Sequence, residues 1–70
     1  MKIYGYENEG SELVSLHEMT LQISIEELKE LSGFILNTIC IMEKYGDSFG
    51  HEHFSDFLKH RVSPDIVITK

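Results

Sequence analysis

The feature that most constrains this chain is a long helix whose two ends are both marked in the sequence. The segment 24–27 matches a capping box, in which Ser24 is the N-cap and Glu27 occupies the third helical position. At the other end, Gly46 is placed to terminate the helix in a left-handed conformation. The sequence therefore predicts one helix that starts after Ser24 and ends near Tyr45.

Apolar residues cover most of the circumference of this helix. At about 100° per residue, one compact stripe is the expected sheet-facing side; it consists of Leu28, Leu31, Ile35, Ile39 and Met42. Phe34, Ile41 and Tyr45 widen the apolar arc on one flank. Leu36 and Cys40 widen it on the other. A helix on a small sheet does not need so wide an arc, so the first flank is a candidate contact with a partner or a second copy. Cover by loops or strand ends of the same chain is the equal alternative.

Four shorter segments have the composition of β-strands. Aromatic and β-branched residues mark the segments 2–7, 13–23, 51–57 and 65–69. The polar residues 8–11 predict a hairpin loop between the first two. A bulge near His17 and a strand with two apolar faces explain the shift of phase in the second segment equally well. A short helical turn over 54–58 competes with the third strand.

The order strand, strand, helix, strand, strand predicts an α+β fold. We expect a single domain over residues 1–70, with a small, mainly antiparallel sheet and the long helix packed on one of its faces. A core of this size gives marginal stability.

Composition restricts the class of protein. Cys40 is the only cysteine among 70 residues, which excludes an intrachain disulfide and a zinc site of four cysteines. No apolar run approaches the ~20 residues of a membrane span, and no cationic segment precedes an apolar one near the N-terminus. These features predict a cytoplasmic protein with no membrane association.

Acidic residues outnumber basic ones by 12 to 6, which gives a formal net charge of −6. Nonspecific nucleic-acid binding depends on Lys and Arg contacts with phosphate, so this balance argues against a nucleic-acid partner. Glu7, Glu9 and Glu12 cluster around the predicted first loop. Such a cluster suits the cationic cleft of a basic partner, a nuclease for example, because opposite charge speeds association. An ordinary solvated loop is the plain alternative.

His51, Glu52, His53 and Asp56 form the densest group of candidate ligands and bases. On a strand, His51 and His53 share a face, so the two imidazoles are placed to bind one metal ion. The group lacks an evident third ligand, and the zinc motif with two histidines four residues apart is absent. We therefore expect no metal and no cofactor, and interpret the histidines as part of a half-exposed strand.

A catalytic set is not evident. Cys40 lies in mid-helix among apolar neighbours, where a buried thiol behaves as a small hydrophobic group, whereas reactive thiols favour helix N-termini or electropositive sites. No phosphate-binding glycine loop is present, and no carboxylate pair is framed by an apolar cleft. The sequence predicts a protein without enzymatic activity.

Several segments together resemble a known family. They are the helix start over residues 21–31, the helix end over 42–44, the segment 50–57 with its His-x-His-x-x-Asp pattern, and the terminal run 65–68. The arrangement resembles the immunity protein 32 family of bacterial polymorphic toxin systems, over residues 19–68. The resemblance implies a small immunity protein that neutralises a toxin encoded beside it, with His51, His53 and Asp56 at the positions of the family's polar signature.

Two hypotheses of function follow. The first is a non-enzymatic binding protein that neutralises a cognate bacterial toxin, basic and nuclease-like, by occluding its site. Its candidate contacts are Glu7, Glu9, Glu12, His51, Glu52, His53 and Asp56. The second is a small homodimeric structural or accessory protein, joined through the helix flank or an exposed sheet edge.

Overall fold

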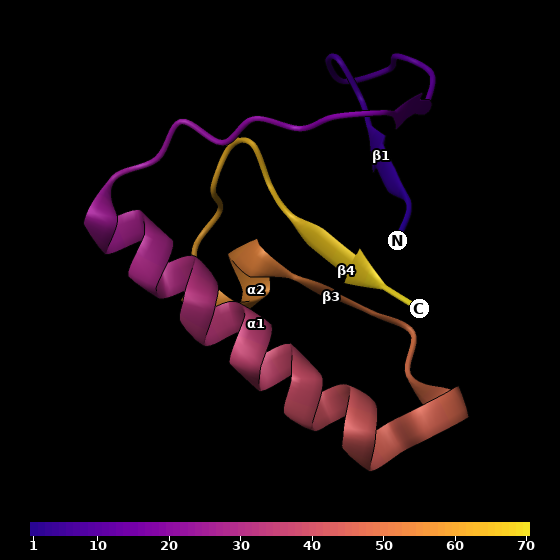
Figure 1. Ribbon diagram of the computed structural model, residues 1–70, viewed down its shortest axis with the longest axis vertical. Helices are drawn as coiled ribbons and strands as arrows, with labels where there is room; N and C mark the ends of the chain where they lie inside the picture. Colours follow the sequence, from indigo (N-terminus) through magenta and orange to yellow (C-terminus); the bar gives the residue numbers. More distant parts are fainter.

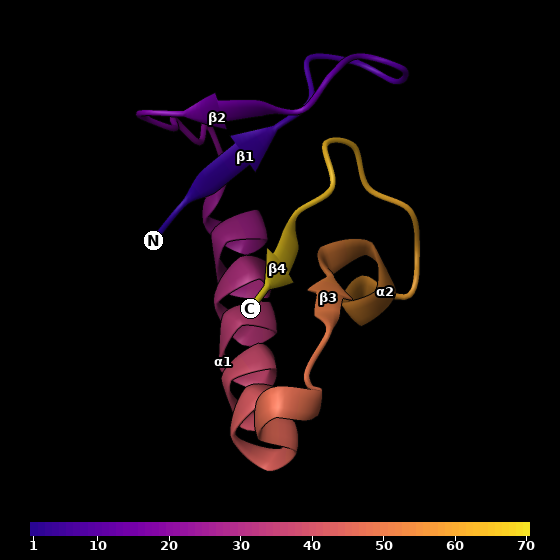
Figure 2. The same cartoon turned by 90° about the vertical axis from the view of Figure 1, so that its right-hand side faces the viewer.

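The computed structural model describes all residues from 1 to 70 and has one long helix as its dominant element. The elements in chain order are β1 (Ile3–Gly5), β2 (Val14–Leu16), α1 (Ile25–Tyr45), the 3-10 turn η1 (Gly46–Ser48), β3 (His51–His53), α2 (Phe54–Leu58) and β4 (Val67–Thr69). Figures 1 and 2 show β3, β4 and α2 together beside α1, with the β1–β2 hairpin set apart at the upper end of the molecule. The α+β class and the long helix are confirmed.

The limits of α1 follow from local chemistry at its two ends. The Glu27 N–H donates to Ser24 Oγ at 3.2 Å, and the Ser24 N–H donates to the Glu27 carboxylate at 3.3 Å, so the predicted capping box is confirmed. At the C-terminal end, the Gly46 N–H donates to the Met42 carbonyl. Gly46 has φ of 53°, which glycine adopts at little cost, but ψ of −123°, outside the left-handed helical region that we predicted.

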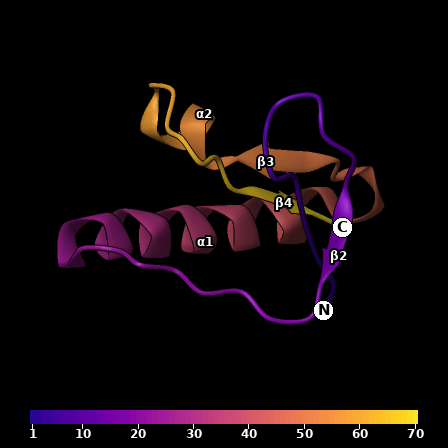
Figure 3. The ribbon, with the colours of Figure 1, turned by 90° about the horizontal axis from the view of Figure 1, so that it is seen from above.

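The strands form two separate sheets, so the prediction of a single sheet is wrong. β1 pairs antiparallel with β2, with Tyr4 opposite Ser15, and β3 pairs antiparallel with β4, with Glu52 opposite Ile68. The segment 17–23, which we assigned to the second strand, runs to the N-cap of α1 without a strand partner. In the view of Figure 3 it lies on one side of α1 and β3, β4 and α2 lie on the other. The two hairpins share no strand pairing, and each forms its own two-stranded sheet.

Both interpretations of the segment 51–57 hold, one after the other. β3 ends at His53 and α2 begins at the next residue. The Phe54 N–H donates to the Ile66 carbonyl at 2.8 Å, which holds the first turn of α2 against the residue before β4. α2 ends at Leu58, and the residue that caps it, Lys59, has φ of 63°.

The core is small and centres on Phe34. Phe34 is fully buried, and its ring centroid lies 5.2 Å from that of Phe54 and 5.8 Å from that of Phe57. Leu31 and Phe54 complete the buried cluster with Phe34; the partly buried residues packed against it are Ile23, Leu58, Val62, Ile66 and Ile68. Thr38 is buried one turn further along α1, where its hydroxyl donates to the Phe34 carbonyl at 2.8 Å.

The buried face of α1 differs from the predicted stripe. Of that stripe, Leu31 is buried and Met42 is half-buried, whereas Leu28, Ile35 and Ile39 are 43–51% exposed. The helix is turned so that Phe34 meets the two aromatic rings of α2, and large rings contribute more to a core than aliphatic groups do. An apolar arc this wide does not reveal which part of it is covered.

Candidate functional site

The seven residues predicted to contact a partner lie in three places. Those in the loop between β1 and β2, all exposed, are Glu7, Glu9 and Glu12. Those on β3 are His51, Glu52 and His53, and the one on α2 is the exposed Asp56. Two regions therefore need description, the loop of the first hairpin and the junction of β3 with α2.

β3 separates its two histidines from the glutamate between them. His51 and His53 point to the same face, with ring centroids 5.1 Å apart in an edge-to-face arrangement, because alternate residues of a strand share a face. Glu52 points to the opposite face, since its strand partner Ile68 packs against the core. The predicted shared face of His51 and His53 is confirmed, and Glu52 lies on the other face as strand alternation predicts.

The two histidines are not joined by a third metal ligand. No group of three or more His, Cys, Asp or Glu side chains lies close enough together to hold a metal ion. One ring nitrogen of His53 already faces a carboxylate, Oδ2 of Asp65, at 2.9 Å. The histidine pair is thus tied to the rest of the junction by an ion pair or hydrogen bond.

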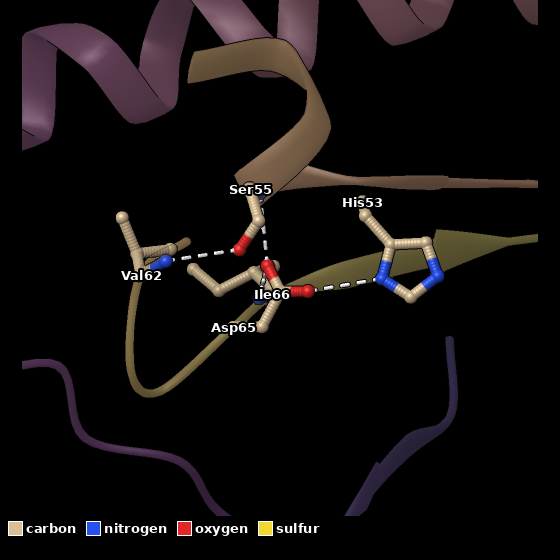
Figure 4. A network of polar contacts seen from close by, with 5 residues as sticks. All are labelled: His53, Ser55, Val62, Asp65 and Ile66. Atoms are coloured by element: carbon tan, nitrogen blue, oxygen red, sulfur yellow. Dashed lines mark hydrogen bonds and ion pairs between the residues drawn. The ribbon is translucent and has the colours of Figure 1, made fainter. Parts of the chain in front are cut away.

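Asp65 joins the start of α2 to the residue before β4. Its Oδ1 accepts the N–H of Ser55 at 3.0 Å and the N–H of Ile66 at 2.9 Å, while its Oδ2 faces His53 Nδ1. Ser55 Oγ in turn accepts the N–H of Val62 at 3.1 Å. Figure 4 shows these five residues, which we call the polar clasp, arranged around the Asp65 carboxylate. Because the first N–H groups of a helix lack helical partners, Asp65 caps α2 from ten residues away.

The clasp lowers the pKa of Asp65 below its ordinary value of 3.8. Burial alone raises this pKa, but hydrogen bonds from the His53 side chain, from the backbone and side chain of Ser55 and from the Ile66 backbone outweigh burial. Asp65 is therefore ionised at neutral pH, where it accepts all three hydrogen bonds.

The geometry of the clasp suits positioning of the chain. An Asp–His pair orients an imidazole for proton transfer in hydrolytic triads, where the other ring nitrogen meets a nucleophile. Here the hydroxyl nearest to His53 in sequence is that of Ser55, and it accepts the N–H of Val62. Three oxygens of the clasp contact three backbone N–H groups and one imidazole ring, and so fix the connection between α2 and β4.

An open hollow of about 650 Å³ adjoins the clasp. Its lining residues are Ser55, Asp56, Lys59, His60, Arg61, Val62, Ser63 and Asp65. Only Val62 among them is apolar, whereas small-molecule sites are lined mainly by apolar side chains. The hollow has the character of a polar surface groove.

The loop between β1 and β2 is held by its own backbone. Ser11 Oγ donates to the Asn8 carbonyl at 2.6 Å and accepts the Asn8 N–H at 3.1 Å. Glu9 Oε1 lies 3.6 Å from Arg61, with both side chains almost fully exposed, so this pair contributes little. The loop therefore presents its glutamates to solvent with a defined backbone and loose side chains.

The helix flank predicted as a contact surface is only partly at the surface. Phe34 is in the core and has no exposed area, Ile41 is half-buried, and Tyr45 is 52% exposed. Cys40, which we expected to be buried, is exposed. Contact through this flank is therefore confined to Ile41 and Tyr45.

Sequence reasoning missed Asp65 and Ser55. We assigned Asp65 to the start of the last strand, and it instead lies two residues before β4. The position of Asp65 directly after Pro64 is a turn signal, since Asp in turns accepts nearby N–H groups. That signal predicts the hydrogen bond to Ile66 but not the contact with His53, which is twelve residues away.

Neither the helices nor comparison with known proteins assigns a role to this site. None of the helices has both the length and the apolar composition needed to cross a membrane. Comparison of the chain with protein-family models, with curated proteins and with solved structures finds no match.

Proposed function

We propose that this protein is a non-enzymatic binding protein that neutralises a cognate bacterial toxin by occluding its site, as the resemblance to the immunity protein 32 family implies. The observation that carries the proposal is the β1–β2 hairpin, which stands apart from the core and carries an acidic loop (Figure 2). Its exposed glutamates are Glu7, Glu9 and Glu12.

Apolar and aromatic side chains beside this loop supply the contact area that charge alone does not. Tyr4 is 50% exposed and Tyr6 is 67% exposed, and both flank the turn into the loop. Tyrosine is enriched among residues that dominate binding energy, because it combines a large rigid ring with a polar group. The hairpin thus joins aromatic anchors to a charged rim, the anatomy of a protein–protein interface.

The partner that fits this surface is basic. Opposite charge raises association rates and selects against acidic partners, and the whole chain carries a net charge of −6. A toxin whose active cleft binds nucleic-acid phosphates presents such a basic surface. Contacts through His51, Glu52, His53 and Asp56 remain a prediction that is secondary to the hairpin.

The test is co-expression with the protein encoded by the neighbouring gene. We expect that protein to arrest bacterial growth, co-expression to restore growth, and the two proteins to co-purify. Glu12→Lys should slow association by about tenfold at low salt, and the matched control Glu30→Lys, on the exposed face of α1, should not. A neighbour that is harmless, or whose toxicity is unchanged by co-expression, would contradict the proposal.

A further inference from the structure

The molecule exposes more surface than a chain of its mass needs. Its accessible surface is 6206 Å², whereas size scaling gives ~4,500 Å² for a compact monomer of 8.1 kDa. The excess is on the order of 1,700 Å². The Cα radius of gyration agrees, at 12.9 Å against ~11 Å for a compact domain of this length. A standard interface removes about 800 Å² from each partner, so the excess is ample for one interface.

Much of the exposed apolar surface lies on α1, outside the face that packs on α2. Five of its aliphatic residues are between 43% and 71% exposed: Ile25, Leu28, Ile35, Leu36 and Ile39. Contiguous exposed apolar patches on a small protein mark interaction sites. None of the five contributes to the core around Phe34.

Four of these five residues, all but Leu36, follow the spacing of a coiled-coil seam together with the exposed Ser32 and the half-buried Met42. Steps of three and four residues connect Ile25, Leu28, Ser32, Ile35, Ile39 and Met42, which are the a and d positions of consecutive heptads. We call these six residues the outer stripe. It lies about 100° around the helix from the core face, so one side of α1 packs on its own chain and the adjacent side has a pattern suited to another helix.

We propose that a second copy of this chain packs on the outer stripe, with the two α1 helices antiparallel across a two-fold axis near Leu36. At the outer stripe, charge does not oppose this occupant. No residue of the outer stripe is charged, so two copies that each carry −6 approach there with least repulsion.

The charges that border the stripe select the antiparallel direction. Lys29 and Glu43 both follow a d position and are both exposed, seven residues on either side of Leu36. An axis near Leu36 puts Lys29 of each copy opposite Glu43 of the other, which gives two attractive pairs. In a parallel dimer, Lys29 would lie level with Lys29 of the other copy and Glu43 level with Glu43, so neither attractive pair would form.

The first experiment measures mass in solution by sedimentation equilibrium. We expect a species of twice the 8.1 kDa chain mass at micromolar concentration. Leu36→Glu should raise the dissociation constant of this dimer by ~100-fold or more, because it places two carboxylates beside the axis. The matched control is Leu13→Glu in the first hairpin, the same change at a leucine that is also more than half exposed. It should leave the dimer intact, and far-UV circular dichroism checks that both variants fold.

A charge exchange tests the direction. Lys29→Glu and Glu43→Lys should each weaken the dimer by on the order of tenfold, and the double variant should restore it. Singles that weaken the dimer without rescue in the double variant would overturn the antiparallel arrangement.

Distances between spin labels test the arrangement without a substitution in the interface. Labels on the native Cys40 should lie ~15 Å apart in the dimer, and labels on Glu26→Cys in a Cys40→Ser background should lie ~30 Å apart or more. Equal separations at both positions would contradict the proposal. A wild-type monomer at millimolar concentration, or a dimer that Leu13→Glu disrupts and Leu36→Glu does not, would overturn it. Neither outcome bears on toxin neutralisation, which is measured separately.

Discussion

Replacement of Asp65 tests whether the polar clasp holds the C-terminal third of the protein together. Asp65→Ala removes the acceptor of the Ser55 and Ile66 N–H groups and the partner of His53. The residues themselves stay at the surface, so the substitution creates no cavity. Its effect therefore reports on the hydrogen bonds and on the charge.

The geometry sets the size of the effect. A hydrogen bond to a charged group contributes ~1.5–3 kcal/mol, but the side chains of Asp65 and His53 are 31% and 39% exposed, and solvent screens them. At about 0.5–1 kcal/mol for each of three contacts, Asp65→Ala should lower the free energy of unfolding by about 2 kcal/mol. That is a large part of the ~3–10 kcal/mol typical for 70 residues, and should lower Tm by roughly 8–16 °C.

The assay is urea and thermal unfolding followed by circular dichroism, with Asp56→Ala as the matched control. Asp56 is a neighbouring exposed aspartate of α2 that makes no side-chain hydrogen bond in the structure. The control should change stability by less than ~0.5 kcal/mol. An Asp65→Ala protein as stable as the control would refute the role that we assign to the clasp.

The dependence of stability on pH gives a second test of the clasp. The pKa of Asp65 in the folded protein lies below its ordinary value of 3.8, so the clasp contributes its stability above that value. The contribution is lost as pH falls through 3.8 toward the lower folded pKa. The stability of the wild type should therefore decline more steeply below pH ~4 than that of Asp65→Asn. Equal acid limbs for the two proteins would show that Asp65 is not the titrating group.

Three further substitutions have expected outcomes that unfolding experiments measure. Gly33→Ala should stabilise α1 by about 0.5–1 kcal/mol, because a Cβ there lies 3.5 Å from the ring of Phe57, an ordinary contact; a loss of stability would show that the ring cannot accept it. Ser24→Ala should cost about 1 kcal/mol through the lost cap, and an unchanged midpoint would mean that water replaces the serine. Phe34→Ala should cost about 3–5 kcal/mol and leave the protein largely unfolded, whereas a cooperative transition near the wild-type midpoint would place the core elsewhere.

The bounds of α1 were predictable because their causes are local. Ser24, Glu27 and Gly46 act on backbone groups within four residues, so the sequence contains both partners of each contact. The face that α1 buries was not predictable in this way. Phe34 is selected by the rings of Phe54 and Phe57, which lie in a helix twenty residues further on.

The sheets and the clasp differ for a similar reason. Strand composition predicted the approximate positions of the four short strands, but not their bounds, nor that the first hairpin would pair only with itself. At the candidate site, the shared face of His51 and His53 follows from strand alternation, while the contact of His53 with Asp65 requires the whole α2–β4 connection to form. Contacts between distant residues depend on packing that no local pattern encodes.

The separation of the β1–β2 hairpin from the core also determines how this protein opens. A two-stranded hairpin without a covering layer is marginally stable in water, and segments with few buried contacts open at far lower free energy than the whole fold. We therefore expect the amide protons of β1 and β2 to exchange with solvent much faster than those of α1 around Phe34. The hairpin therefore opens and closes many times while α1 stays folded. The affinity of a ligand that binds the closed hairpin then depends on the free energy of this local opening and not on that of global unfolding.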